Sequence, residues 1–566
     1  MHLRFTAPAA AALLLCASAR AADTVLTWIG NENLWTDPQG GATTNTPANN
    51  VPAGATYALI IPGGNLTVSS ANSVINALTI SGSNEISAKA VVVKDLFVNG
   101  GFTVLNSADI SGNLQLHDIN LYFNGTATIG ASLPTVIEGS GSSAVLTNNG
   151  TMTIGNQTSF QGGLVLINNG LLDISAGGYL PFSYPSSIEN DATLRLHSGS
   201  ITSARTNSGS FSIDAGATLT GNYSTFTASS SITGQGNFDP GLSSTIQGAF
   251  NISGNTTVSV FSALDFQTAA HTGSLTLAGP LSSSSSITVD GPFTATGGTL
   301  TATGSVTVNG PVSISSGAFN AAGGLIINGN TTLQQSSQDF IVIGGSLTNQ
   351  AGRTLTLSTP LEYPHDGTIG LSQSSTLINS GLFNTGPGAI TADYSAQSHA
   401  TFRNAGTLTV NAPHDAFKIL NGYYTPLTFI NTGTLTVSAG TCRIAAPQDP
   451  ATTGIFNVNA GATLEFSANY DFSSPTDPTL TGAGLLIIDP GITLALPVDS
   501  AFSGTIEVNG TLLLTAPRDP NSTLTSPNFT VLNTPVPEPA SLTLLAVGAT
   551  ALFRRRRIPR RAIHRP

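Results

Sequence analysis

The 566-residue sequence predicts an all-β fold: an elongated right-handed parallel β-helix, or solenoid, with an N-terminal signal peptide and a short C-terminal hydrophobic anchor helix. Short units recur in which apolar residues alternate with Thr, Ser or Asn, Asn-x-Gly turns separate them, and convincing helical patterns are absent after residue 22. We therefore expect a signal peptide over 1–21, a solenoid body over 22–534 with a cap over roughly 22–75, and a distinct C-terminal segment over 535–566.

The segment 1–21 has the pattern of a secretory signal peptide. Arg4 follows His2 in a weakly basic start, Ala7 to Ala17 form an apolar region, and Ala19-Arg20-Ala21 is a small-x-small cleavage site. We expect a secretion translocon and a signal peptidase as partners, with the mature chain beginning near Ala22.

The body contains repeated units that start with Asn and end with Ile or Leu. They follow one another at short and slightly varying intervals, and the units are Asn148–Ile154, Asn168–Ile174, Asn190–Leu196 and Asn207–Ile213. Phe402–Val410 and Phe429–Val437 are near copies of each other. A further unit, Phe211–Leu219, is matched by Phe456–Leu464.

The spacing of these units favours a solenoid. Asn and Gly tolerate left-handed backbone angles, so the chain can turn sharply between short strands. A period of roughly 20 residues is too short for a self-sufficient sheet and suits one coil whose apolar residues stack on the next. We expect Leu408 and Leu435 to point inward. An antiparallel sandwich or barrel is the alternative, but it does not explain the regular recurrence.

The asparagines at the repeated turns have two interpretations. Asn404 and Asn431, which start the turns of the two near copies, can form side-chain ladders along the solenoid axis. Alternatively, each asparagine serves only its own turn. The sequence leaves both open.

The only two tryptophans lie near the start of the body. Thr27-Trp28-Ile29-Gly30 and Leu34-Trp35 resemble the Trp-x-Gly...Trp opening of bacterial surface proteins built from autotransporter-associated β-strand repeats. We expect the two rings to close the first coil, because an open solenoid edge invites aggregation. The other interpretation is a platform on which a carbohydrate stacks.

The C-terminal segment carries the most specific pattern. Val536, Pro537, Glu538 and Pro539 precede an apolar run from Leu542 to Phe553, which is followed by four consecutive arginines, Arg554, Arg555, Arg556 and Arg557. This order resembles the PEP-CTERM sorting domain of Gram-negative bacteria. The resemblance implies an exosortase-type membrane protease as partner, transient anchoring in the inner membrane, and final placement at the cell surface or outside the cell.

Physical properties of this segment agree with the resemblance. The prolines keep the chain extended, as a protease cleft requires. The run from Ala540 to Phe553 would be about 21 Å long as a helix, short of the roughly 20 residues that span a bilayer, so the arginines must snorkel as a positive-inside membrane stop. An ordinary C-terminal tail anchor is the alternative, but it leaves the Pro-Glu-Pro element unexplained.

Composition restricts the partners of the body. Charged residues make up 8% of the chain, and its net charge of -11 includes the arginines of the tail, so the body alone is more acidic. Nucleic acid is therefore not expected as a partner. Cys442 is the one cysteine of the body, so the body cannot form an internal disulfide. The stability of the body must then come from packing and hydrogen bonds.

The sequence shows no clear pattern of catalytic or metal-binding residues. The histidines of the body show no metal-ligand spacing; they are His117, His197, His271, His365, His399 and His414. His365-Asp366 and His414-Asp415 are local pairs that fit surface loops. β-Helix lyases and glycosidases need clustered carboxylates, whereas Asp239 and Asp489 both lie in turn-like Asp-Pro-Gly sequences far apart. We expect no catalytic residue, no metal and no cofactor.

These observations predict an exported, non-catalytic structural or adhesion protein of the cell surface or extracellular matrix, processed by an exosortase-type system and active in biofilm assembly. A carbohydrate-binding surface protein with an extracellular polysaccharide as partner is the alternative, and a β-helix polysaccharide lyase or glycosidase a further one. A carbohydrate binder needs exposed aromatics in line. The tyrosines that could serve as such aromatics lie instead in irregular insertions: Tyr179, Tyr184, Tyr363, Tyr423 and Tyr424.

Overall fold

The structure is a computed structural model, and the residues that it describes contain strands, turns and irregular segments but no helix. The described residues are 24–28, 35–36, 57–60, 74–81, 91–110, 114–130, 135–140, 144–155, 158–175, 187–203, 205–334, 341–358, 368–372, 374–392, 399–421, 426–474, 476–519 and 527–533. The predicted signal peptide over 1–21 and the C-terminal segment over 535–566, with its anchor helix, lie outside them.

The chain divides into two compact units, Met1–Gly381 and Leu382–Pro566, here called the first and the second unit. The strands of the first unit are β1 (Thr24–Trp28), β2 (Trp35–Thr36), β3 (Tyr57–Ile60), β4 (Val74–Ser81), β5 (Val91–Ile110), β6 (Leu114–Ile129), β7 (Thr135–Ser140), β8 (Val145–Asn148), β9 (Thr151–Ile154), β10 (Thr158–Gln161), β11 (Val165–Asn168), β12 (Leu171–Ile174), β13 (Ser187–Asn190), β14 (Thr193–Leu196), β15 (Ser200–Ser203), β16 (Thr206–Asn207), β17 (Ser210–Ile213), β18 (Thr218–Gly221), β19 (Ser224–Phe226), β20 (Ser231–Gly234), β21 (Asn237–Asp239), β22 (Ser243–Ile246), β23 (Ala249–Val258), β24 (Ala263–Phe266), β25 (Ala270–Leu277), β26 (Leu281–Ser283), β27 (Ile287–Val289), β28 (Phe293–Ala302), β29 (Val306–Val308), β30 (Val312–Ile327), β31 (Thr331–Gln334), β32 (Ile341–Asn349), β33 (Thr354–Ser358), β34 (Thr368–Leu371) and β35 (Thr376–Asn379). Those of the second unit are β36 (Leu382–Thr385), β37 (Gly388–Ala392), β38 (Ala400–Asn404), β39 (Thr407–Leu420), β40 (Leu427–Asn431), β41 (Thr434–Ile444), β42 (Ile455–Val458), β43 (Ala462–Phe466), β44 (Tyr470–Asp471), β45 (Thr479–Gly482), β46 (Leu485–Ile488), β47 (Thr493–Pro497), β48 (Thr505–Val508), β49 (Thr511–Thr515) and β50 (Thr530–Asn533).

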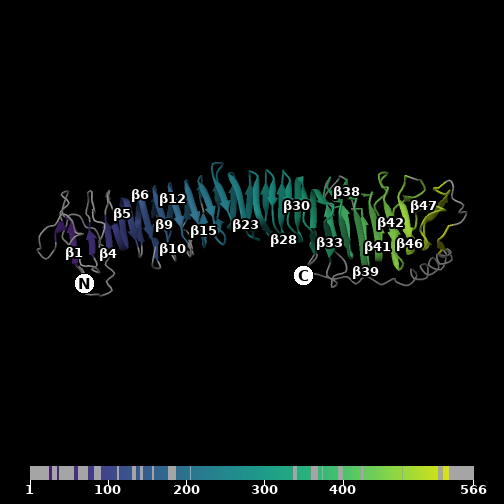
Figure 1. The fold of residues 1–566 in the computed structure, drawn as a ribbon, viewed down its shortest axis with the longest axis horizontal. Coiled ribbons are helices and arrows are strands. Elements are labelled where there is room, and N and C mark those ends of the chain that lie inside the picture. Colours follow the sequence, from purple (N-terminus) through teal and green to yellow (C-terminus); the bar gives the residue numbers. More distant parts are fainter. Residues whose placement is uncertain are drawn as a thin grey trace, which may run out of the picture. The chain divides into compact units, whose positions relative to one another are not determined.

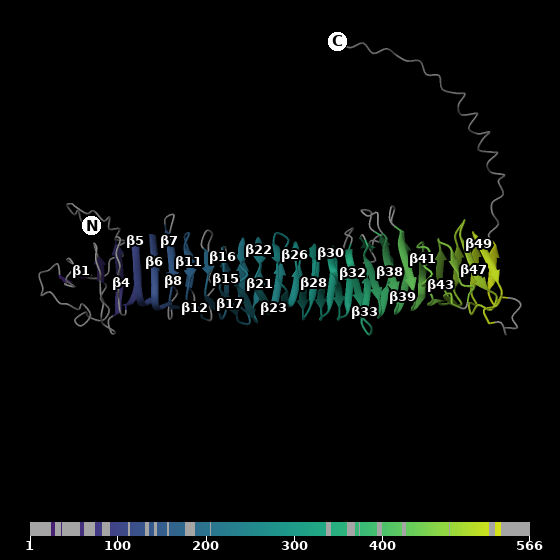
Figure 2. The ribbon, with the colours of Figure 1, turned by 90° about the horizontal axis from the view of Figure 1, so that it is seen from above.

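The coils of the first unit stack in parallel register, as the sequence predicts. Asn168 pairs with Asn148 one coil earlier and with Asn190 one coil later, and Leu194 pairs with Phe211. The intervals between the repeated units are therefore the lengths of successive coils. Figures 1 and 2 show the purple to teal strands of this unit lying side by side along one axis. The parallel pairing rules out the antiparallel sandwich or barrel for these coils, and their right-handed sense stays a prediction.

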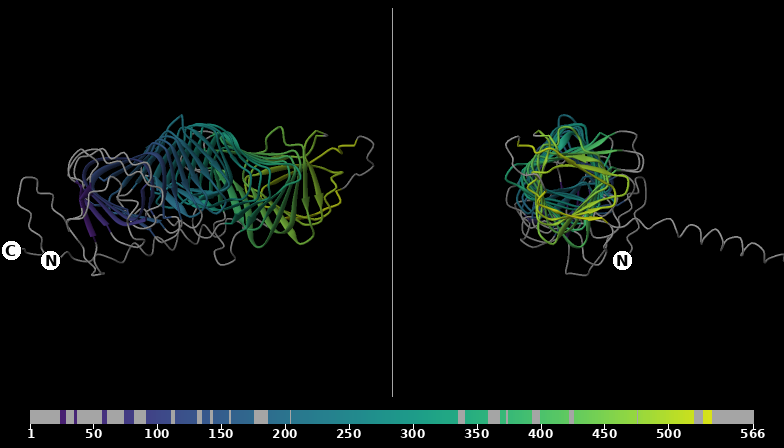
Figure 3. Two further views of the ribbon diagram at one scale, coloured as in Figure 1. Left: turned by 60° about the vertical axis from the view of Figure 1, so that its left-hand side comes forward. Right: turned by 90° about the vertical axis from the view of Figure 1, so that its right-hand side faces the viewer.

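The core of each coil consists of the apolar residues that alternate with polar ones. In the first unit Phe211 and Phe226 lie on two strands of one coil, Phe238 lies on the next coil and Phe250 on the coil after that. Their ring centroids are 5.4, 6.0 and 5.3 Å apart in chain order, in edge-to-face contacts. This geometry places the positive ring edge on the negative face of the next ring. Figure 3 shows the strands wrapping around an interior, which these buried side chains fill.

The second unit confirms the predicted stacking of the near copies. Phe402 pairs with Phe429, and Leu408 pairs with Leu435, so each residue lies one coil before its counterpart in the second copy. Both leucines are fully buried. Their inward orientation follows from strand alternation, because side chains at every second position share one face.

The two tryptophans lie opposite each other in the backbone. β1 pairs with β2 in antiparallel register, with Trp28 facing Trp35 along the ladder, and it pairs in parallel with β3. This three-stranded sheet lies within the predicted cap over 22–75. That the two rings close the first coil stays a prediction.

Candidate functional site

A row of buried asparagines runs through the first unit at the repeated turns. Asn148 Nδ2 donates to Asn168 Oδ1 over 2.7 Å, and Asn168 Nδ2 donates to Asn190 Oδ1 over 2.7 Å. All three residues, here called the Asn ladder, are fully buried. Gly150 N also donates to Asn148 Oδ1 over 3.1 Å, within the same turn. The ladder and the local turn, which the sequence offers as alternatives, are thus combined in one side chain.

The second unit contains the predicted asparagine pair. Asn404 Nδ2 donates to Asn431 Oδ1 over 2.8 Å, and the two side chains are fully buried. The Asn404 amide also donates to the carbonyl of Thr434 over 3.0 Å, and that of Asn431 to the carbonyl of Ile455 over 3.0 Å. These bonds satisfy the amide groups inside the core, which is the arrangement that a buried polar group requires.

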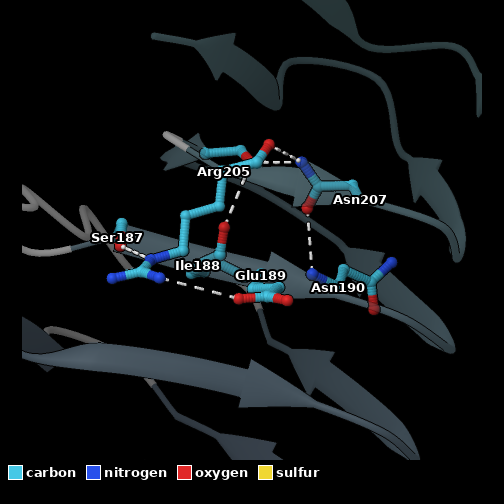
Figure 4. Close-up of polar contacts among 7 residues, drawn as sticks. Ser187, Ile188, Glu189, Asn190, Arg205 and Asn207 are labelled. Atoms are coloured by element: carbon cyan, nitrogen blue, oxygen red, sulfur yellow. Dashed lines mark hydrogen bonds and ion pairs between the residues drawn. The ribbon is translucent and has the colours of Figure 1, made fainter. Parts of the chain in front are cut away.

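In the first unit the Asn ladder ends at Asn207, on a short coil. Figure 4 shows Asn207 Oδ1 accepting a bond of 2.9 Å from the backbone amide of Asn190. Its Nδ2 donates to Ser203 Oγ and to the carbonyl of Arg205, both over 2.8 Å, and Ser203 Oγ donates to the carbonyl of Ile188. β13 and β15 share the single register pair of Ile188 and Ser203, so side chains supply the bonds that a longer ladder would make.

Arg205 lies on the outer side of the same corner. Its Nε donates to Ser187 Oγ over 3.0 Å, and its Nη1 lies 3.8 Å from Glu189 Oε2 (Figure 4). The arginine side chain is 46% exposed, so the ion pair adds little to stability. The contacts instead hold the guanidinium across the strand, and the carboxylate offsets its charge.

The second unit contains a polar cluster that the sequence analysis missed. Arg443 Nε lies 3.1 Å from Glu465 Oε1 and donates to Ser467 Oγ, and Arg443 Nη2 donates to Asp489 Oδ2 over 3.1 Å. Burial raises the pKa of the Glu465 carboxyl, Arg443 opposes that shift, and Asp489 reinforces it. The sequence reveals no signal for this cluster, because Arg443 and Asp489 lie far apart along the chain. In this cluster Arg443 binds both carboxylates, so neither Glu465 nor Asp489 is an isolated acid or base.

Two histidines of the first unit pair with aspartates of neighbouring coils. His197 lies between Asp173 and Asp214, with Nε2 at 3.0 Å from the first and Nδ1 at 2.7 Å from the second. The hydrogen bond with Asp214 raises the pKa of His197 above its usual value. His271 Nε2 lies 2.5 Å from Asp290 Oδ2, and this bond lowers the pKa of Asp290. These contacts join adjacent coils at the surface.

The aspartate and the histidine-aspartate pairs that the sequence analysis named do not form a common site among the described residues. Asp239 accepts a bond from Gly241 N within its own turn, as a turn-like sequence predicts. His414 and Asp415 lie within β39, at the interruption of its register between Ala412 and Ala416, rather than in a loop between strands. The His365-Asp366 pair lies outside the described residues.

Cys442 is buried and is the one cysteine among the residues that the structure describes, and burial raises the pKa of its thiol above the usual value. A cysteine held as the neutral thiol is a weak nucleophile. It packs in the core of β41 next to the outward-facing Arg443.

The predicted sorting residues also lie outside the described part of the chain: Val536, Pro537, Glu538, Pro539, Arg554, Arg555, Arg556 and Arg557. Their sequence alone nevertheless identifies the sorting motif. Residues 535–557 match the PEP-CTERM protein-sorting motif. The motif implies processing by an exosortase-type membrane system, and with it export and transit through a membrane-anchored state. The chain thus combines a PEP-CTERM sorting motif with a β-helix fold.

A search of the curated proteins found no match, and neither did a search of the solved structures. Among the described residues, no helix is long and apolar enough to cross a bilayer. The same residues contain no group of three or more His, Cys, Asp and Glu side chains that could hold a metal ion. The resemblance of the repeats to autotransporter-associated strands stays a prediction.

Proposed function

We propose that this PEP-CTERM protein is an exported, non-catalytic structural or adhesion protein, which an exosortase-type protease processes before it reaches the cell surface or the extracellular matrix. The match of residues 535–557 to the sorting motif carries the proposal. A motif of this kind directs a chain out of the cell and to a membrane-bound processing system, so the function of the body is exercised outside.

The chemistry of the body supports a structural role. Parallel coils with a continuous apolar core and buried amide ladders make a rigid scaffold, because each coil is hydrogen-bonded to the next. The chain is rich in Ser, Thr and Asn, and charged residues are 8% of it. Such a composition suits adhesion and biofilm assembly by many weak contacts.

The contacts of the charged side chains favour a non-catalytic role. Both ring nitrogens of His197 are engaged by aspartates, Nε2 of His271 is engaged by Asp290, and Arg443 is engaged by two carboxylates. A catalytic acid or base needs a free site within reach of a substrate atom. We expect no turnover of polysaccharide by the purified protein.

The sorting step is tested by replacing Pro537 and Glu538 with Ala in the natural host. The wild-type protein isolated from the surface should lack the C-terminal peptide, whereas the variant should remain in the membrane at full length. Pro527→Ala, outside the motif, is the matched control and should be processed normally. Mass spectrometry of the C-terminal peptide decides: surface protein that still ends in Ile563–Pro566 makes the tail a permanent anchor and refutes processing.

A further inference from the structure

Among the described residues of the first unit, four large apolar side chains are exposed to solvent. They are Tyr223, Leu242, Val260 and Phe261, with exposed fractions of 69%, 45%, 67% and 85%. A single exposed apolar residue is ordinary, but a contiguous group on a soluble surface marks a binding site. Four such residues therefore indicate a binding site if they lie together on the surface.

The strand register places them at one corner of three successive coils. They lie in the loops that join β18 to β19, β21 to β22, and β23 to β24. Before these loops, β18 pairs with β21, which pairs with β23; after them, β19 pairs with β22, which pairs with β24. Because the strands on both sides are stacked neighbours, the loops stack as well. We call these four residues the apolar corner.

The two aromatic rings of the apolar corner are spaced along the solenoid axis. Adjacent parallel strands lie about 4.8 Å apart, so Tyr223 and Phe261, two coils apart, are about 10 Å from each other along the axis. Leu242 occupies the coil between them. The row therefore runs parallel to the axis, the direction in which a linear polymer can lie across several coils.

Tyr223 is held in a strained backbone conformation. Its φ is 56°, in the left-handed region that a bulky residue rarely adopts. At the corresponding loop of the next coil, Gly241 adopts a φ of 62° without strain. A glycine would serve the Tyr223 turn better, so folding alone does not account for the tyrosine. Backbone strain of this kind is concentrated at functional sites, among them those that bind ligands.

A shallow hollow with a mixed lining, more apolar than polar, begins directly after the apolar corner, on the outer side of β22, β24, β26 and β28. Its lining includes Ser243, Ala263, Asp265, Pro280, Ser282 and Thr299. Asp265 Oδ1 accepts a bond of 2.6 Å from Ser282 Oγ, and Asp265 Oδ2 accepts one of 3.1 Å from Gln267 Nε2, so each oxygen keeps one further lone pair for a ligand. The hollow thus offers hydroxyl groups and one carboxylate on the strands that follow the loop of Phe261.

We propose that the apolar corner and this hollow bind a neutral polysaccharide chain, lying along the solenoid axis. The weakly positive C–H face of a sugar ring stacks on the negative face of an aromatic ring. The hydroxyls and the Asp265 carboxylate accept hydrogen bonds from sugar hydroxyls, and the hydroxyls also donate to them. On the preceding coil Arg205 lies 3.8 Å from Glu189, so the two side chains together present no net positive charge to an acidic polymer.

A protein partner fits the corner less well. A stable protein interface covers roughly 800 Å² on each side, whereas a large aromatic side chain supplies roughly 150–250 Å². Two aromatic and two aliphatic side chains, all partly covered by their own coils, fall well short of that area. A narrow row along the axis matches a polymer one sugar wide.

The test is affinity electrophoresis of the full chain in gels that contain hydroxyethylcellulose, a neutral polysaccharide, with alginate as the acidic comparison. A detergent without a sugar headgroup keeps the tail soluble and does not compete. The wild type should be retarded by the neutral polymer only. The double variant Tyr223→Gly and Phe261→Ala should bind about tenfold more weakly, and Phe261→Tyr should bind as the wild type.

Leucine variants separate the corner from general surface hydrophobicity. Leu242→Ala should weaken binding, whereas Leu513→Ala, at a residue of similar exposure (53%) in the second unit, should not. Tyr223→Gly relieves backbone strain, and circular dichroism of the double variant should match that of the wild type, so that binding is compared between folded proteins. Equal binding by the double variant, retardation by alginate alone, or a dimer that Phe261→Ala converts to a monomer would each overturn the proposal. Processing of the tail is read separately, so a failure here leaves the sorting proposal standing.

Discussion

The Asn ladder is the feature whose contribution to stability can be measured most directly. Asn168→Ala removes its central member. In the wild type, Asn168 Nδ2 donates to Asn190 Oδ1 over 2.7 Å and to the carbonyl of Thr193 over 2.9 Å, and Asn168 Oδ1 accepts from Asn148 Nδ2 over 2.7 Å. The substitution leaves all three groups without this partner in a site that is fully buried.

Each buried polar group that loses its hydrogen bond costs about 1–3 kcal/mol, so the three together predict a loss of about 3–9 kcal/mol. The adjacent Asn169 is a matched control. Its amide makes the same kind of bond to the preceding coil, from Nδ2 to Asn149 Oδ1 over 3.0 Å, but that pair is exposed. Water replaces the lost bond there, so Asn169→Ala should cost less than about 1 kcal/mol.

Hydrogen exchange read by mass spectrometry is the appropriate assay, because a solenoid opens coil by coil rather than in one two-state transition. Asn168→Ala should speed exchange at least about a hundredfold in peptides covering 145–196, and leave peptides of 300–330 unchanged. Equal effects of the two alanine substitutions, or a loss of protection spread evenly over the first unit, would refute the reasoning that buried amide ladders hold neighbouring coils.

Two further predictions concern single side chains. Leu435→Asp places an unpaired charge at a fully buried position between Leu408 and Phe456, so limited proteolysis should cut the adjoining coils of the second unit first; unchanged resistance there would mean that the register is wrong. Because the pKa of His197 is raised, its protonated form stabilises the fold fully below pH 6.5, and that contribution is lost as the pH rises through the folded-state pKa. An NMR titration should show the pKa falling toward 6.5 in Asp214→Asn; an unaltered value would exclude that carboxylate as the cause.

The alternation of apolar and polar residues and the repeated Asn-x-Gly turns were sufficient to predict a parallel solenoid. They also predicted the inward orientation of Leu408 and Leu435, and they offered the stacking of Asn404 on Asn431 as one of two alternatives. These features are local, because each repeat unit contains both its strand and its turn. When two near copies are aligned, equivalent residues must lie one coil apart. The sorting motif is likewise contained in a continuous stretch, so its residues could be identified without any structure.

The tertiary structure decided the features that depend on where one coil lies over the next. Coil length varies, being shorter between the paired residues Leu194 and Phe211 than between Phe402 and Phe429, so spacing alone does not say which side chains meet. The apolar corner is the clearest case. Its residues lie in loops of different length and composition, and only the register of the flanking strands brings them together. Arg443 and Asp489, two coils apart, meet for the same reason: in a solenoid the neighbours of a side chain are set by the stacking of coils.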